Sequence, residues 1–163
     1  MPRTEVLTLV RLSERSFEGD PHQSLIANLR RLRRIDWNTP PPGGRRTIGD
    51  ILEHVGWAKW MYADYAFGSA SLPGDKPPMI PKGGASVRPT EELMIWIKEG
   101  HQKWISAVES LQDDELDVLR LTNWGERLSA RHLIENLICH DLYHAGEVNH
   151  VRAILQNDDQ WRY

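Results

Sequence analysis

The chain has 163 residues and a formal net charge of −3, and 26% of its residues are charged. A chain of this length can bury one ordinary hydrophobic core, so we expect a single domain over residues 1–163. Neither sign of charge dominates, which argues against nucleic acid or a membrane surface as a partner. No stretch approaches the roughly 20 apolar residues needed to span a bilayer.

The cysteine content and the N-terminal residues indicate a cytoplasmic protein. Cys139 is the one cysteine, so an intrachain disulfide is excluded. The apolar run from Val6 to Val10 is short and is followed at once by Arg11, unlike a secretory signal. The one local excess of charge is a basic cluster, which we interpret as a solvated helix face: Arg30, Arg31, Arg33 and Arg34.

The first third of the chain predicts two helices and a loop. Apolar residues recur with helical period from about Thr4 to Glu18, and strand-like alternation is nearly absent throughout the chain. Asp20 is placed to cap a short second helix that carries Leu25, Ile26, Leu29 and Leu32. Residues 38–44 are rich in Pro and Gly and are predicted to form a loop.

The rest of the chain predicts three longer helices. Thr47 and Asp50 resemble a capping box at the start of one, and Ser129 is placed to cap the last, which runs to about Leu155. Between these two helices, a third is expected from about Pro89 to Leu111. A long loop over residues 68–89 precedes it, and an irregular stretch over 112–128 follows it. Four main helices with a long middle crossover predict an all-α four-helix bundle.

Two histidines in the last helix give the main clue to function. His140 and His144 are four residues apart, and a helical projection places both in the middle of an apolar stripe with Glu147. Buried imidazoles need partners, and two at this spacing project from one face about 6 Å apart, close enough to share a metal ion. His54, on the edge of the apolar stripe of an earlier helix, is the strongest third ligand, and His101 is the alternative.

Three imidazoles suit zinc, nickel, iron or copper better than magnesium or calcium, and they leave positions for water or substrate. Asp141 stands where zinc proteases of the His-Glu-x-x-His pattern have their catalytic glutamate, although its side chain is one methylene shorter. Glu147 is predicted to act as a general base, a fourth ligand or a partner that orients an imidazole.

Two segments, in this order, resemble the DinB-like superfamily, and within it the YfiT-like branch of metal-dependent enzymes. They are residues 46–57, which contain His54, and residues 140–147, which contain the histidine pair. Ser16 to Gly19 and the proline loop before Arg45 add to the likeness, so it spans nearly the whole chain. The family commonly has glutamine where this chain has Glu147.

The resemblance implies an up-up-down-down bundle, often dimeric, with a nickel- or zinc-type ion held at His54, His140 and His144. It further implies a low-molecular-weight thiol as co-substrate, so the leading hypothesis is a thiol-dependent S-transferase acting on small electrophiles. Glu147 or Asp141 would accept the thiol proton. Tryptophan and tyrosine side chains are numerous, and a homodimer through aromatic helix faces is expected.

Two other interpretations stay open at this stage. The first is a metal-dependent hydrolase, in which water takes the place of the thiol. The second is a non-catalytic bundle that a metal ion only stabilises.

Overall fold

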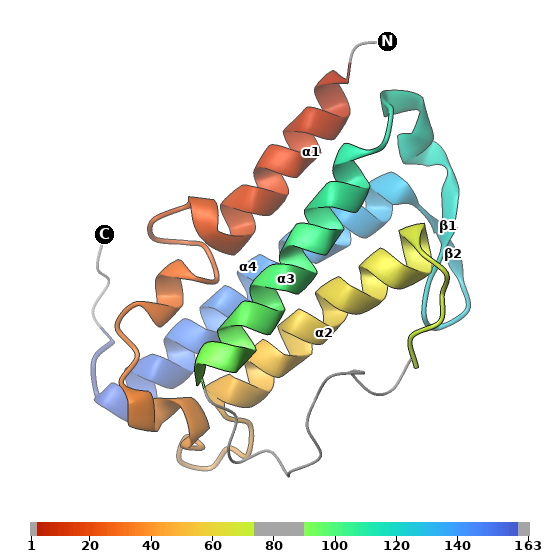
Figure 1. Cartoon of the computed structure of the whole chain (residues 1–163). Coiled ribbons are helices and arrows are strands. Elements are labelled where there is room, and N and C mark those ends of the chain that lie inside the picture. Colours follow the sequence, from red (N-terminus) through yellow and green to blue (C-terminus); the bar gives the residue numbers. More distant parts are fainter. Residues whose placement is uncertain (1–2, 74–89, 160–163) are drawn as a thin grey trace.

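The structure is a computed structural model, and it describes residues 3–73 and 90–159 of the chain. Four helices form a bundle (Figure 1): α1 (Thr4–Glu14), α2 (Ile48–Phe67), α3 (Thr90–Glu109) and α4 (Ala130–Gln156). A short antiparallel hairpin, β1 (Leu119–Leu121) and β2 (Arg127–Ser129), lies between α3 and α4. The predicted all-α bundle is confirmed.

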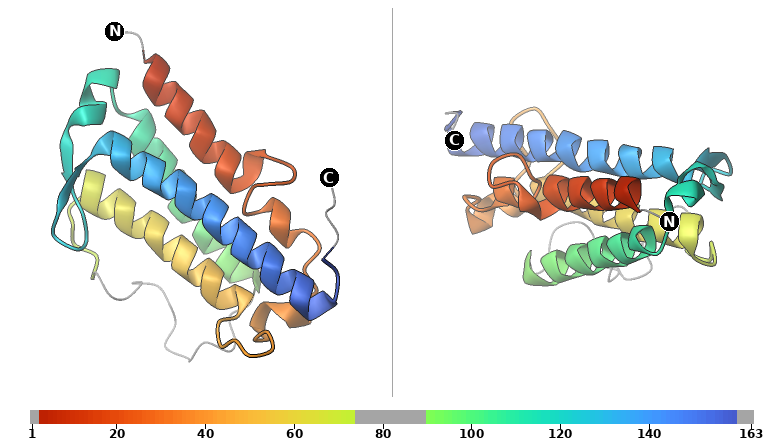
Figure 2. Two further views of the ribbon diagram at one scale, coloured as in Figure 1. Left: turned by 180° about the vertical axis from the view of Figure 1, so that it is seen from behind. Right: turned by 90° about the horizontal axis from the view of Figure 1, so that it is seen from above.

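The helices α1 and α4 run in one direction, and α2 and α3 run in the other (Figure 1). This order differs from the expected up-up-down-down arrangement, because α2 is antiparallel to α1. The helix α4 lies between α1 and α2 in the view from behind (Figure 2), and it contacts both of them. The functional segments of α2 and α4 are therefore neighbours.

Both predicted N-caps are present and fix where α2 and α4 begin. Thr47 Oγ1 accepts a hydrogen bond from the Asp50 amide at 3.1 Å, and Asp50 Oδ2 accepts one from the Thr47 amide at 2.8 Å. Ser129 Oγ accepts from the His132 amide at 3.2 Å. These bonds satisfy amides that lack partners within the helix. By fixing the residue at which each helix begins, they also fix the face on which each later side chain lies.

Two predictions of local structure are wrong: the second short helix, and the irregular stretch over 112–128. The first helix, expected to about Glu18, is α-helical to Glu14 and continues as a π-helical turn, Arg15–Gly19. The segment expected to form the second helix is a series of turns with one 3-10 segment, Ala27–Leu29. The amides of Leu25 and Ile26 donate to the carbonyls of Ser16 and Phe17, which folds this segment back onto the π turn. The stretch 112–128, expected to be irregular, contains a 3-10 turn (Asp113–Asp117) and strand β1.

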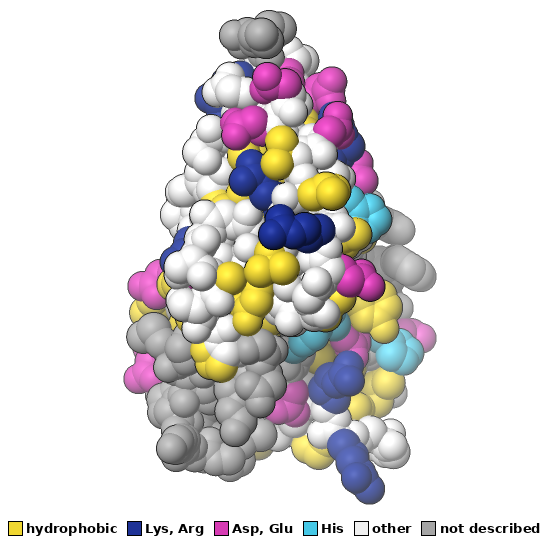
Figure 3. All heavy atoms as spheres, turned by 90° about the vertical axis from the view of Figure 1, so that its right-hand side faces the viewer, with side chains coloured by type: hydrophobic (Ala, Val, Ile, Leu, Met, Phe, Trp, Pro, Cys, Tyr) yellow, Lys and Arg dark blue, Asp and Glu magenta, His cyan; other side chains and the backbone are white. Residues whose placement is uncertain are grey.

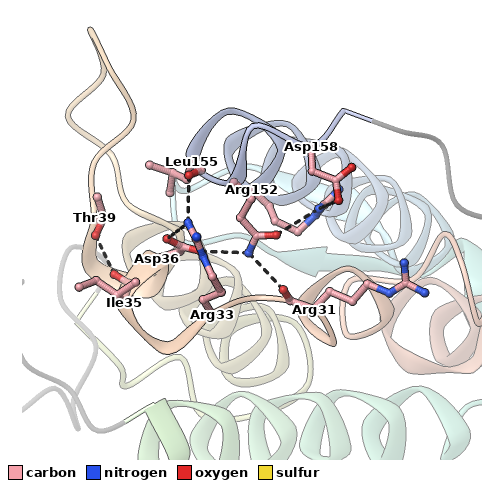
Figure 4. A network of polar contacts seen from close by, with 9 residues as sticks. Arg31, Arg33, Ile35, Asp36, Thr39, Arg152, Leu155 and Asp158 are labelled. Atoms are coloured by element: carbon pink, nitrogen blue, oxygen red, sulfur yellow. Dashed lines mark hydrogen bonds and ion pairs between the residues drawn. The ribbon is translucent and has the colours of Figure 1, made fainter.

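A polar network ties the 3-10 segment Arg34–Asn38 to the end of α4 (Figure 4). The Arg33 guanidinium donates to both oxygens of Asp36, at 2.7 and 3.0 Å, and to the Leu155 carbonyl at 3.0 Å. The hydrogen bonds of Asp36 hold the pKa of its carboxyl below the ordinary value, chiefly through Arg33. The basic cluster is therefore solvated at Arg30, Arg31 and Arg34, whereas Arg33 also has a structural role.

The apolar core has two parts, one toward each end of the bundle. One part gathers residues of the hairpin end, among them Val6, Trp104, Val108, Leu133 and Leu137. The other gathers Phe17, Leu52, Ile97, Val148 and others at the opposite end. Buried polar side chains from all four helices and the π turn lie close to the boundary between the two parts: Ser13, Ser16, Lys59, His101, Asp141 and His144. This polar layer contains the candidate site.

Among the residues that the structure describes, no helix is long and apolar enough to cross a membrane. Residues 74–89, most of the loop predicted over 68–89, lie outside the described part of the chain.

Candidate metal centre

Three histidine side chains from α2 and α4 converge at the edge of the polar layer. One imidazole nitrogen from each of His54, His140 and His144 lies within 4.8 Å of the others. The Nε2 atoms of His54 and His140 are 3.0 Å apart. His144 is buried, His140 is half-buried and His54 is exposed, so the cluster opens to solvent on the side of α2. One face of the molecule shows histidine side chains beside basic and acidic ones (Figure 3).

The donor set fits a divalent transition metal. Two imidazole nitrogens that bind one ion at about 2.0–2.1 Å lie about 2.9–3.4 Å apart at octahedral or tetrahedral bond angles. The separation of 3.0 Å between His54 and His140 falls in this range. Burial lowers the pKa of His140 to about 3 and also lowers that of His54, and in both the neighbouring His144 adds to the effect. Both rings are therefore neutral at neutral pH, the form that binds metals.

Glu147 contacts the most buried histidine of the cluster. Its Oε2 lies 2.7 Å from His144 Nδ1, one helical turn away, and its Oε1 accepts a hydrogen bond from Arg46 Nη1 at 3.1 Å. With Nδ1 engaged by a carboxylate, the Nε2 atom of His144 is the one left for an ion. The sequence pattern indicated Glu147 but not its partner Arg46.

Asp141 points away from the solvent side of the cluster, into an ion pair within the bundle. Its Oδ2 lies 2.8 Å from Lys59 Nζ and 3.4 Å from Ser16 Oγ, and the Lys59 and Asp141 side chains are 1% and 2% exposed. Burial raises the pKa of Asp141 and lowers that of Lys59, and the contact between the two charges opposes both shifts. The likeness of Asp141 to the catalytic glutamate of zinc proteases did not predict this pairing with Lys59.

The prediction that His140 lies in the middle of the apolar stripe of α4 is wrong. Asp141 lies on the buried side of the helix with Leu137, Ala145 and Val148, whereas His140 lies at its margin. A signal for Lys59 was present in the sequence, because it is four residues after Val55 and seven after Leu52 on the buried side of α2. Opposite charges on the buried faces of two helices predict an internal ion pair.

His101, the alternative third ligand, is separate from the cluster. Its ring stacks on Phe17 with centroids 3.9 Å apart, and its Nε2 lies 3.3 Å from Glu14 Oε2. Burial, with a smaller effect of Lys59, lowers the pKa of His101 to about 2. Lys59 also lies over the Phe17 ring, 4.7 Å from its centroid, so His101 belongs to the polar layer behind the histidine cluster.

The family profile of the DinB superfamily matches residues 22–148, which include the histidine cluster, Lys59, Asp141 and Glu147. No curated protein matches the chain. Since the match covers most of the sequence, the chain belongs to the DinB superfamily.

Proposed function

We propose that the protein is a metal-dependent enzyme of the YfiT-like kind that transfers a low-molecular-weight thiol to small electrophiles. The observation that carries the proposal is the convergence of His54, His140 and His144 at a cluster open to solvent on one side. Zinc and nickel are the ions expected from the imidazole donors. A closed structural site would instead surround the ion with four protein ligands.

A bound divalent ion would supply one chemical effect, lowering the pKa of the thiol so that it reacts as the anion at neutral pH. The thiol sulfur then forms a bond to the electrophilic carbon, and the leaving group departs with its electron pair. Glu147 is the proposed proton acceptor, because it lies beside His144 and its side chain is 25% exposed. Asp141 is assigned a structural role instead, since Lys59 engages its carboxylate away from solvent.

The test is an activity assay on zinc- and nickel-loaded protein. Each sample receives a thiol with a small electrophile in one series and a panel of esters and amides in another. Loss of free thiol that depends on the protein supports S-transfer, and Glu147→Ala should slow it by about 10–100-fold. Turnover of esters or amides without any thiol reaction would favour the hydrolase interpretation.

A metal-stabilised bundle without activity is the remaining alternative. It predicts that Glu147→Ala changes no measurable turnover, while His54→Ala lowers only the melting temperature. Homodimer formation also remains a prediction, which light scattering of the purified protein would decide.

A further inference from the structure

Arg46 lies beside the candidate metal centre, in contact with Glu147, which in turn contacts His144. It directly precedes Thr47, the N-cap of α2, and its guanidinium donates to Glu147 Oε1 at 3.1 Å. Through Glu147 it is one contact away from His144.

Most of the hydrogen-bonding capacity of Arg46 faces solvent. The side chain is 63% exposed, and among the described residues Glu147 is the one hydrogen-bond partner found for it. A guanidinium has five N–H donors in a planar fork that matches a carboxylate. Asp50, an acidic group in the first turn of α2, has its carboxylate engaged by Thr47 in the helix cap. Arg46 therefore has donors available on the open side.

The charges around the centre also favour an anionic ligand. The charges of Arg46 and Glu147 cancel, as do those of Lys59 and Asp141 behind them. His54, His140 and His144 would bind an ion as neutral imidazoles, so they add no negative charge that offsets it. A divalent ion would therefore keep about two uncompensated positive charges. A thiolate would offset one of them, and a second anionic group on the same molecule would offset the other.

We propose that Arg46 binds a carboxylate on the thiol co-substrate, so that the enzyme selects thiols carrying an anionic group over neutral ones. This inference rests on the proposed thiol transfer. It assigns Arg46 a place in substrate recognition and leaves the positioning of His144 to Glu147.

The experiment measures thiol binding to zinc-loaded protein by isothermal titration calorimetry. The probes are 3-mercaptopropionate and 2-mercaptoethanol, which differ by a carboxylate in place of a hydroxyl group. The wild type is compared with Arg46→Gln and with Arg45→Gln, a control that removes the same charge from the neighbouring exposed position. Metal content is measured first, so that only loaded protein is titrated.

The wild type and Arg45→Gln should bind the carboxylate thiol about tenfold more tightly than the neutral one, the effect of one charge-assisted contact. Arg46→Gln should lose this preference and bind the neutral thiol as the wild type does. Equal binding of both thiols by the wild type would overturn the inference and leave the proposed function standing, as would an unchanged preference in Arg46→Gln. Binding of neither thiol would overturn both.

Discussion

Lys59 and Asp141 form the most enclosed charged contact found among the described residues, and they join α2 to α4 directly behind the histidine cluster. Taking two charges out of water is costly, and their mutual attraction offsets that cost only while both are present. The pair is therefore weak evidence for stability in itself. Removing one partner, in contrast, leaves the other charge buried without a countercharge.

The variant Lys59→Met should lower the free energy of unfolding by about 3–5 kcal/mol, because it leaves Asp141 buried without its countercharge. The double variant Lys59→Met with Asp141→Leu should recover most of this loss, since apolar side chains fill the same space. Urea denaturation measures both. A loss below about 1 kcal/mol in the single variant would show that water reaches Asp141 and that the pair is not enclosed.

His101 should make the protein sensitive to mild acid. The groups that face it are Phe17, Glu14 and Lys59, and burial holds its pKa at about 2 in the folded state against 6.5 ordinarily. Below pH 6.5 the unfolded chain therefore takes up a proton that the folded chain does not. Its contribution is fully present above that pH and is lost progressively as the pH falls toward 2.

Between pH 7 and pH 5 this one histidine should account for about 2 kcal/mol of lost stability. The variant His101→Gln cannot take up the proton, so its free energy of unfolding should fall by about 2 kcal/mol less over the same interval. Urea denaturation at both pH values gives the comparison. The same pH dependence in both proteins would mean that His101 is accessible to protons when folded.

At the scale of elements, the packing of α2 against α3 depends on Gly56. A Cβ atom there would lie 2.4 Å from Cζ3 of Trp96 and 2.8 Å from Cγ1 of Ile97. Such contacts force a displacement of α3, which carries His101. Gly146 on α4 offers the contrast, since nothing lies within 4 Å of a Cβ at that position.

The variant Gly56→Ala should lower the free energy of unfolding by about 1–3 kcal/mol through overpacking. The matched variant Gly146→Ala should raise it by about 0.5–1 kcal/mol, because alanine favours an exposed helix interior. Thermal or urea denaturation distinguishes the two. A neutral Gly56→Ala would show that α2 and α3 separate readily.

The elements that the sequence predicted well are those set by local chemistry. The capping residues Thr47 and Ser129 and the apolar periodicity of α2, α3 and α4 are short-range signals. The π turn was not predicted, because long-range packing fixes it. The hairpin was not predicted either, because strands of three residues carry little sequence pattern. The histidine pair was visible from its spacing, and His54 from its place beside an apolar stripe. Arg46 was not, since only the packing of α2 on α4 brings it to Glu147.

At the scale of the molecule, the histidine cluster would let an ion link α2 to α4. His54 comes from one helix, and His140 and His144 come from the other. A ligand that binds only the folded state stabilises it by about 2.7 kcal/mol at a concentration of 100 times Kd.

Removing the metal with a chelator should therefore lower the melting temperature by roughly 5–10 °C for a chain of this size. Differential scanning calorimetry before chelation, after chelation and after zinc is restored measures the effect. Identical melting temperatures in all three samples would mean that no ion bridges the two helices.

The metal content of the purified protein, measured by elemental analysis, tests whether the three histidines share one ion. The wild type and His132→Ala, an exposed histidine on the same helix, should each retain one zinc or nickel ion per chain. The variants His54→Ala, His140→Ala and His144→Ala should each lose most of it. Equal metal content in all five proteins would contradict the shared site on which the proposed chemistry depends.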